Sequence, residues 1–370
     1  MTQKYRKKVT KSGKGAFSLY IPKKWIDGWK GEQAKDRNVD LIQMDDLLII
    51  SPVQKSSLKS VRLDSDSVDQ VKHFLLSCYV RGFESAEIIT RTKFTDEQIC
   101  GARSFVRSLD DRLTLEITEN RIAYDKNAAA MLSRPDAMQL QRLLFDKLLE
   151  GVRLMEELVE HFDRNPRRGI HLMQMLKLLE EDTDRLGLQI LRLASRMEIP
   201  FENLVDLYYF VLTTNTMENI GDSMFGMVRD VCHIYNLDPA KLQYPPDTLM
   251  KEVGKPVERL DSSLDNLRQT YVAHLKTCSK NIETLKRLTL SDETEKVQAL
   301  IGGLTLFRDT IGEDLGKSIK NMLTKGQDSL QGQSLPHLIR MGYRISDIAA
   351  KLEEFSKHSV TFHFSPDLSD

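Results

Sequence analysis

The sequence has few residues that break helices and few aromatic side chains. Only 19 glycines and 11 prolines occur in 370 residues, and aromatic residues make up 7% of the chain. A chain rich in Leu, Met, Glu, Lys and Arg with so few breakers favours long helices. A chain of this length is too long for one ordinary hydrophobic core, so two or three domains are expected.

Cysteine is also scarce, and its spacing excludes two classes of protein. The four cysteines, Cys78, Cys100, Cys232 and Cys278, lie far apart and form no Cys-x-x-Cys motif. This spacing argues against a zinc site and against a disulfide framework, and it favours free thiols in a reducing compartment. No apolar run is long enough to span a bilayer. We therefore expect a cytoplasmic protein that does not insert into a membrane.

The chain lacks an excess of charge of either sign. Its formal net charge is -1, so the molecule as a whole is not an electrostatic binder of polyanions. Contact with a nucleic acid would have to come from a local basic patch. One such patch lies at the N-terminus, within residues 1–53.

Residues 1–53 are predicted to form a small β-rich domain. Alternation of Phe17, Leu19 and Ile21 predicts a strand with one buried face, and residues 39–44 and 47–50 predict a β-hairpin. So short a segment hardly buries its apolar face alone, so a homodimer is expected.

Residues 57–127 are predicted to form a small α/β subdomain. Helical periodicity covers residues 67–81 and 95–109, and strand-like patterns cover 87–90, 113–118 and 121–123. The segment contains neither a phosphate-binding loop nor a nucleophile elbow.

From residue 136 onward, helical periodicity continues with few breaks. Three helices are predicted before a proline-rich loop and three after it, at residues 136–164, 168–197, 202–235, 248–288, 292–325 and 336–357. This order predicts an internal duplication, with one three-helix bundle at 135–236 and a degenerate second bundle at 247–358. The predicted fold class is therefore mostly α, with tandem three-helix bundles after the β-rich and α/β segments.

Two pairs of acidic residues stand four residues apart on consecutive predicted helices. Glu180 pairs with Asp184, and Glu218 pairs with Asp222. On a helix this spacing puts both carboxylates on one face. Facing pairs would supply four oxygen ligands to a hard divalent cation, whereas each pair alone is more typical of a solvated helix face. Gly221, inside the second pair, weakens a helix unless close packing requires it.

The predicted second bundle contains a weaker version of these acidic pairs. Asp309 and Glu313 align with the first pair, and Asp347 aligns with Asp222. Tyr343 stands where Glu218 would be. A second metal site at Asp309, Glu313 and Asp347 is therefore expected to be weaker or missing.

The acidic segments resemble those of the phosphate-uptake regulator (PhoU) family. Residues 218–222, Glu-Asn-Ile-Gly-Asp, are similar to the family signature written around Glu-Arg-Ile-Gly-Asp, and the Glu180–Asp184 segment is similar to its partner on the preceding helix. The resemblance implies paired three-helix bundles that bind divalent or transition metal ions, such as Mg, Mn, Fe or Zn. It also implies a role in restraining phosphate transport or signalling, through a transporter ATPase or a signalling protein.

The N-terminal segment resembles the AbrB/SpoVT swapped-hairpin domain, which archaeal PhoU-like proteins often carry. The resemblance rests on residues 9–13, Val-Thr-Lys-Ser-Gly, and residues 18–23, Ser-Leu-Tyr-Ile-Pro-Lys. It implies a dimer that presents basic residues to DNA phosphates, namely Arg6, Lys7, Lys8, Lys11 and Lys14. The alternative is a basic edge strand that only keeps the protein soluble.

These residues are compatible with three functions. The first is a PhoU-like regulator that binds metal and acts through partners. The second is a DNA-binding transcriptional regulator with the helical bundles as its sensor, and both can hold together. The third, a di-metal enzyme in a helical bundle, is disfavoured because no Glu-x-x-His motif accompanies the acids. We therefore predict that the protein is not an enzyme and that its eight scattered histidines are structural or at the surface.

Overall fold

The computed structural model describes two units of the chain, Met1–Ser57 and Leu58–Asp370. Within them, the described residues are 10–11, 17–18, 23, 39–44, 47–52, 59–62, 68–83, 85–91, 93–109, 113–126, 137–195, 204–253, 262–290, 294–325 and 334–363. The described structure is mostly helical with a small sheet, which confirms that the fold is mostly α.

The described part of the first unit consists of two antiparallel strand pairs. Strand β1 (Thr10–Lys11) pairs with β2 (Phe17–Ser18), and β3 (Val39–Met44) pairs with β4 (Leu47–Pro52). Met44 lies opposite Leu47, so the predicted hairpin is confirmed. The likeness to the AbrB/SpoVT domain stays a prediction.

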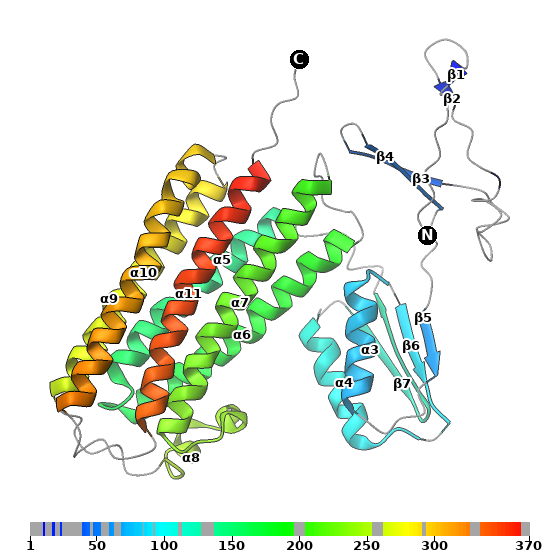
Figure 1. The fold of residues 1–370 in the computed structure, drawn as a ribbon. Helices are drawn as coiled ribbons and strands as arrows, with labels where there is room; N and C mark the ends of the chain where they lie inside the picture. Colours follow the sequence, from blue (N-terminus) through cyan, green and yellow to red (C-terminus); the bar gives the residue numbers. More distant parts are fainter. Residues whose placement is uncertain are drawn as a thin grey trace. The chain divides into compact units, whose positions relative to one another are not determined.

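A small sheet with two helices opens the second unit. Strands β5 (Lys59–Arg62), β6 (Ser85–Ile89), β7 (Leu113–Thr118) and β8 (Arg121–Lys126) lie in the order β5-β6-β8-β7. Helices α3 (Val68–Val80) and α4 (Asp96–Leu109) cover one face of the sheet (Figure 1) and share its hydrophobic core.

Strand β5 was not predicted from the sequence. It pairs in parallel with β6, whereas the other neighbours in the sheet are antiparallel. The segment Lys-Ser-Val-Arg contains a single apolar residue, so it shows no alternation that would indicate a strand.

Six long helices form the rest of the unit and run side by side (Figure 1). They are α5 (Ala137–His161), α6 (Pro166–Ser195), α7 (Leu204–Ile234), α9 (Ser262–Leu290), α10 (Thr294–Lys325) and α11 (Ser334–His363). Buried residues from all six belong to one continuous hydrophobic core. Within it, the rings of Phe145 on α5 and Phe355 on α11 meet edge to face with centroids 5.3 Å apart.

The predicted beginning of one helix was wrong. The sequence pattern predicted a continuous helix over 248–288, but the structure has a 3-10 helix (Pro239–Gln243), the short α8 (Pro246–Leu249), and α9 beginning only at Ser262. Gly254 and Pro256 lie between α8 and α9 in the sequence. Both residue types disfavour a continuous helix, Gly because of its backbone freedom and Pro because it lacks an N–H.

Local sequence signals set the ends of the two helices that carry the acidic pairs. Helix α6 begins with a proline, and the side chain of Asn165 accepts a hydrogen bond from the backbone N–H of Arg168 at 3.1 Å. Helix α7 is closed by Asn236, whose φ is 55°. The N–H of Leu237 then donates to the carbonyl of Cys232 at 2.8 Å, which completes a Schellman ending.

Arg192 on α6 joins the six long helices to the α/β subdomain. Its guanidinium donates to the carbonyl oxygens of Tyr79 at 2.7 Å and Phe83 at 3.0 Å, and it lies 4.5 Å from the centroid of the Tyr79 ring. Nearby, the Ser195 hydroxyl donates to the carbonyl of Val80 at 2.6 Å. Tyr79 and Val80 belong to the last turn of α3, where carbonyls have no partner within the helix, and the positive charge of Arg192 suits that end of the helix dipole.

None of the helices in the described part of the chain combines the length and the apolar character needed to cross a membrane.

We predict that Arg192→Met destabilises the protein. Arg192 is only 4% exposed, and hydrogen bonds to a charged group each contribute about 1.5–3 kcal/mol. The free energy of unfolding from urea titration is expected to fall by about 2–3 kcal/mol. The control, Arg287→Met, changes an exposed residue of α9 and is expected to stay within about 0.5 kcal/mol of the wild type. Equal stability of the two variants would contradict the role of Arg192.

Candidate functional site

The structure brings the two predicted acidic pairs together. Glu180 and Asp184 lie on α6, and Glu218 and Asp222 lie on α7. Asp222 is close enough to raise the pKa of each of the other three carboxyls, and Asp184 raises the pKa of Glu180 and Glu218. The four carboxylates therefore occupy one site between neighbouring helices, as the spacing in the sequence predicted.

Two glycines lie where α6 and α7 meet at this site, and one of them, Gly221, is tightly packed. A Cβ on Gly187 would lie 3.4 Å from Oε2 of Glu218, and a Cβ on Gly221 would lie 3.0 Å from Oγ1 of Thr183. Thr183 is fully buried, and its hydroxyl donates to the carbonyl of Glu180 at 2.8 Å. The sequence predicts that Gly221 serves close packing, and its contact with Thr183 agrees with this, whereas Gly187 faces Glu218 at an ordinary contact distance.

Burial and mutual repulsion raise the pKa of three of these carboxyls. Burial first, and then the charges of Asp184 and Asp222, raise the pKa of Glu180 to about 7. The same causes raise the pKa of Glu218 to about 7, and burial together with Asp222 raises that of Asp184 to about 6. Burying ionised carboxylates beside one another is unfavourable unless a cation or a proton compensates them. Such a site is therefore suited to holding positive charge.

Part of the site opens into a groove that also involves α11. Its volume is about 470 Å³, and we call it the α6–α7–α11 groove. It is lined by Glu180, Asn219, Asp222, Ser223, Phe225, Arg229, Arg344, Asp347 and Lys351.

Asp347 belongs to this first site and not to a second one. The hydroxyl of Ser223 on α7 donates to Oδ2 of Asp347 on α11 at 2.5 Å. The sequence had aligned Asp347 with Asp222 as equivalent positions of two halves. The structure places both carboxylates in the α6–α7–α11 groove, because α11 packs directly against α7.

The other two predicted ligands of a second site lie elsewhere, on the outer surface of α10. The Asp309 side chain is 60% exposed and pairs with Arg308 at 2.9 Å. The Glu313 side chain is 74% exposed and lies 3.5 Å from Lys317. Each carboxylate thus has a basic neighbour on its own helix, and neither lines the groove with Asp347. The expected weakness of a second site agrees with this arrangement.

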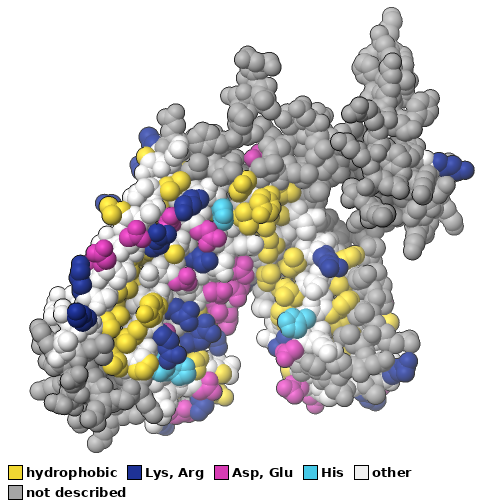
Figure 2. Space-filling view, in the orientation of Figure 1, with side chains coloured by type: hydrophobic (Ala, Val, Ile, Leu, Met, Phe, Trp, Pro, Cys, Tyr) yellow, Lys and Arg dark blue, Asp and Glu magenta, His cyan; other side chains and the backbone are white. Residues whose placement is uncertain are grey.

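Basic residues at the groove were not recognised in the sequence. Arg229 on α7 and Arg344 and Lys351 on α11 line it together with the acids. Arg344, Asp347 and Lys351 follow one another at intervals of three and four residues, which is the spacing of one helix face and could have been noticed. Figure 2 shows a patch of acidic side chains bordered by Lys and Arg side chains on the long helices.

In the part of the chain that the structure describes, no three His, Cys, Asp or Glu side chains converge tightly enough to hold an ion as they stand. The four carboxylates are neighbours, and their charges raise the pKa of Glu180, Asp184 and Glu218, but they do not form a ligand shell. Their oxygen donors and their excess negative charge nevertheless fit a hard divalent cation.

Two histidines that the sequence analysis treated as structural or at the surface meet beside the groove. The rings of His233 on α7 and His337 on α11 stack with centroids 4.7 Å apart. Nδ1 of His337 lies 3.3 Å and Nε of Arg340 lies 3.2 Å from Oδ1 of Asp230, which is 4% exposed. This cluster links α7 to α11 and gives the histidines a structural role.

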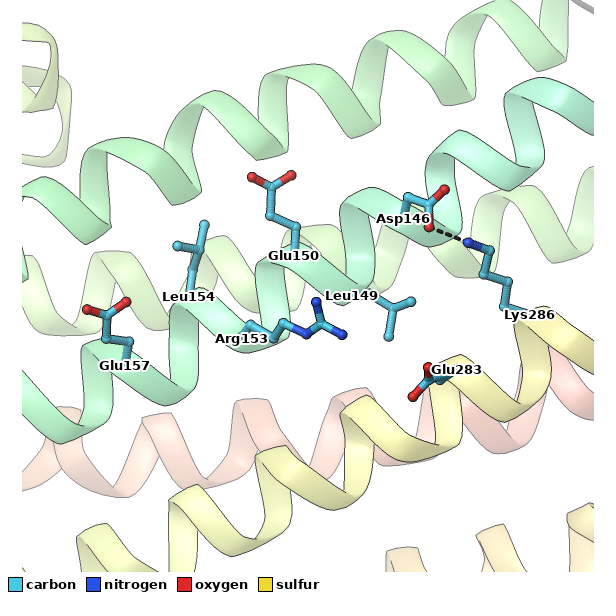
Figure 3. Close-up of a pocket in the computed structure, with 8 residues that line it drawn as sticks. All are labelled: Asp146, Leu149, Glu150, Arg153, Leu154, Glu157, Glu283 and Lys286. Carbon is cyan, nitrogen blue, oxygen red and sulfur yellow. Dashed lines mark hydrogen bonds and ion pairs between the residues drawn. The ribbon is translucent and has the colours of Figure 1, made fainter.

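A second groove, of about 370 Å³, lies between α5 and α9. Figure 3 shows Lys286 of α9 reaching Asp146 of α5 across it, with Arg153 and Glu150 on the α5 side. Acidic and basic side chains both line it, and its lysine is already paired with Asp146. We assign no ligand to it.

The basic residues predicted to contact DNA fall almost entirely outside the described residues. Arg6, Lys7, Lys8 and Lys14 lie outside them, and Lys11 ends strand β1. DNA binding therefore stays a prediction from the sequence.

Comparison of the sequence with protein-family models and with curated proteins finds no match.

The raised pKa values predict that the metal-free protein loses stability as the pH rises. Unfolded Asp and Glu titrate near pH 4, whereas Glu180, Asp184 and Glu218 titrate at about 7, 6 and 7 in the fold. Between these limits the folded state binds more protons, so its stability falls as the pH rises from about 4 to about 7. After solvent screening, each group is expected to contribute on the order of 1 kcal/mol.

This prediction is tested by urea unfolding in chelator at several pH values. The wild type is expected to be more stable at pH 5 than at pH 8. In Glu180→Gln with Glu218→Gln the difference is expected to shrink, because two of the groups that titrate are removed. Glu313→Gln, on the exposed face of α10, is the control and is expected to keep the wild-type slope. The same slope in all three proteins would contradict the assignment.

Proposed function

We propose that this protein is a metal-dependent, PhoU-like regulator of phosphate uptake or phosphate signalling that acts through protein partners and not as an enzyme. The observation that carries the proposal is the meeting of Glu180, Asp184, Glu218 and Asp222 between α6 and α7. It supports the proposal because these are the residues that resemble the acidic segments of the family.

The four carboxylates are the residues that would hold the metal. They offer hard oxygen donors, which suit Mg, Mn, Fe or Zn ions to different degrees. A bound ion supplies positive charge that removes the repulsion between the acids. The chain's own contribution is the close packing at Gly221, which brings α7 against Thr183 of α6.

Metal binding would thereby stabilise one arrangement of α6 and α7 and the surface that they present. In the proposal, this surface is what a transporter ATPase or a signalling protein recognises. No histidine lines the α6–α7–α11 groove, which favours a binding role over the Glu-x-x-His chemistry of di-metal enzymes.

The finer architecture belongs to the same proposal. Helices α5 to α7 and α9 to α11 are interpreted as two tandem three-helix bundles, the second of which has lost its acidic site. The first unit is interpreted as a dimerising AbrB/SpoVT-like domain, so the regulator would be a homodimer in the cytoplasm. DNA binding through that domain remains the alternative function, supported by its basic sequence alone.

The metal site is tested by elemental analysis of the purified native protein. We expect a bound Mg, Mn, Fe or Zn ion, and we expect Glu218→Gln with Asp222→Asn to lose it. The matched control is Asp309→Asn with Glu313→Gln, which makes the same charge change on exposed carboxylates of α10 and is expected to keep the ion. The proposal fails if the native protein binds none of these ions, or if the α7 variant keeps its full metal content.

The regulatory role is tested in cells of the source organism. Cells that lack the protein are expected to take up labelled phosphate faster than the wild type in phosphate-rich medium. Reintroduced wild-type protein is expected to restore the restraint, whereas Glu218→Gln with Asp222→Asn is not. Identical uptake with and without the protein at every phosphate concentration would overturn the phosphate part of the proposal and leave the metal site to be judged separately.

A further inference from the structure

The α6–α7–α11 groove contains cations as well as acids. Arg229 comes from α7, and Arg344 and Lys351 come from α11. They stand beside Glu180, Asp222 and Asp347 in one cavity of about 470 Å³. The four-carboxylate metal site does not require these three cations, so they call for a separate explanation.

The two arginines are not engaged in close ion pairs with the acids of the groove. The Arg229 guanidinium lies 5.5 Å from the centroid of the Phe225 ring, and its charge lowers the pKa of Glu180, although no salt bridge joins the two side chains in the described part of the chain. Arg344 has only a long contact with Asp230, with 4.0 Å between Nε and Oδ2. Lys351 is paired with Glu354 at 3.2 Å. Two guanidinium groups at the groove thus retain donors for a ligand.

A glycine on α7 makes room for one of these arginines. A Cβ on Gly226 would lie 2.6 Å from Nε of Arg344 and 2.8 Å from its Cζ. The guanidinium therefore rests against the backbone of α7 at a residue where any side chain would displace it. Glycine inside a helix is unfavourable by roughly 0.5–1 kcal/mol relative to alanine, and the position of Arg344 gives this glycine a physical reason.

We propose that the α6–α7–α11 groove binds a small tetrahedral oxyanion of the inorganic phosphate class through Arg229, Arg344 and Lys351. The planar fork of a guanidinium matches the oxygens of phosphate, and an ammonium adds a compact charge. Ser223 already donates to Asp347, so the guanidinium groups are the main free donors for the anion.

The acids of the groove determine when the anion binds. Glu180, Asp222 and Asp347 repel an anion as long as their charges are uncompensated. A divalent cation held by the carboxylates would remove that repulsion and attract the anion to the adjoining cations. This part of the inference rests on the proposed function, and it predicts that metal and phosphate bind cooperatively. The regulator would then read the phosphate concentration itself.

The test is equilibrium dialysis of the full-length protein with labelled inorganic phosphate, with chelator or with submillimolar Mn²⁺. Metal content is measured on the same samples. Saturable phosphate binding is expected with Mn²⁺, and it is expected to weaken at least tenfold in Arg229→Gln with Arg344→Gln, which should keep its metal. Arg287→Gln with Lys280→Gln, on exposed positions of α9, is the control and is expected to bind phosphate as the wild type does.

A second variant tests the position of the Arg344 guanidinium without removing any charge. Gly226→Ala keeps every charged group but displaces the Arg344 guanidinium, so it is expected to weaken phosphate binding at least several-fold while metal content and the far-UV spectrum stay unchanged. Competition with sulfate and with a nucleoside monophosphate tells whether free phosphate, any tetrahedral oxyanion or a phosphate ester is the preferred ligand.

Each outcome bears on one site. No saturable phosphate binding in either condition, or wild-type binding by the arginine variant, overturns the anion site whatever the metal content. Phosphate binding that needs the arginines but is equally strong in chelator and in Mn²⁺ supports the anion site and contradicts its cooperativity with metal. The proposed metal site is contradicted if no Mn²⁺ is bound in the samples dialysed with it. Phosphate binding that needs both Mn²⁺ and the arginines supports the whole arrangement.

Discussion

The close packing of α6 against α7 is the constraint on which the rest of the site depends. Gly221 of α7 leaves room for the buried Thr183 of α6, from whose hydroxyl an added Cβ would lie only 3.0 Å away. The four carboxylates are therefore held near one another although their charges repel. A helix pair assembled in this way is incomplete electrostatically, and a cation or bound protons complete it.

The long helices form one core, and this has a consequence for the site. Helix α11 packs against α7 within that continuous core, so it carries Asp347, Arg344 and Lys351 into a groove shared with α6 and α7. The duplicated sequence pattern predicted a second acidic site in the second half that is weaker or missing. In the fold the second half contributes to the first site, while the acids of α10 remain on the surface, paired with basic neighbours.

The balance of charges in the groove distinguishes it from an ordinary solvated helix face. On exposed helices, acids and bases pair along the same helix, as Glu313 does with Lys317. At the acidic site three carboxyls have raised pKa values, and one of them, Glu180, also lines the groove, where the charge of Arg229 acts on it. In the two proposals above, a cation at the acids and an anion at the arginines would occupy adjoining places, and this would link the two sites physically.

The sequence by itself determined the helical class, most helix positions and the two acidic pairs on α6 and α7, because helical periodicity and i, i+4 spacing are local properties. It missed β5, whose single valine gives no alternation, and it placed the beginning of α9 too early. Only the tertiary structure decided that Asp347 joins Asp222, that Arg344 lies against Gly226 and that Arg192 binds the end of α3. These contacts join residues far apart in the chain, and side-chain packing between helices, not any local pattern, selects them.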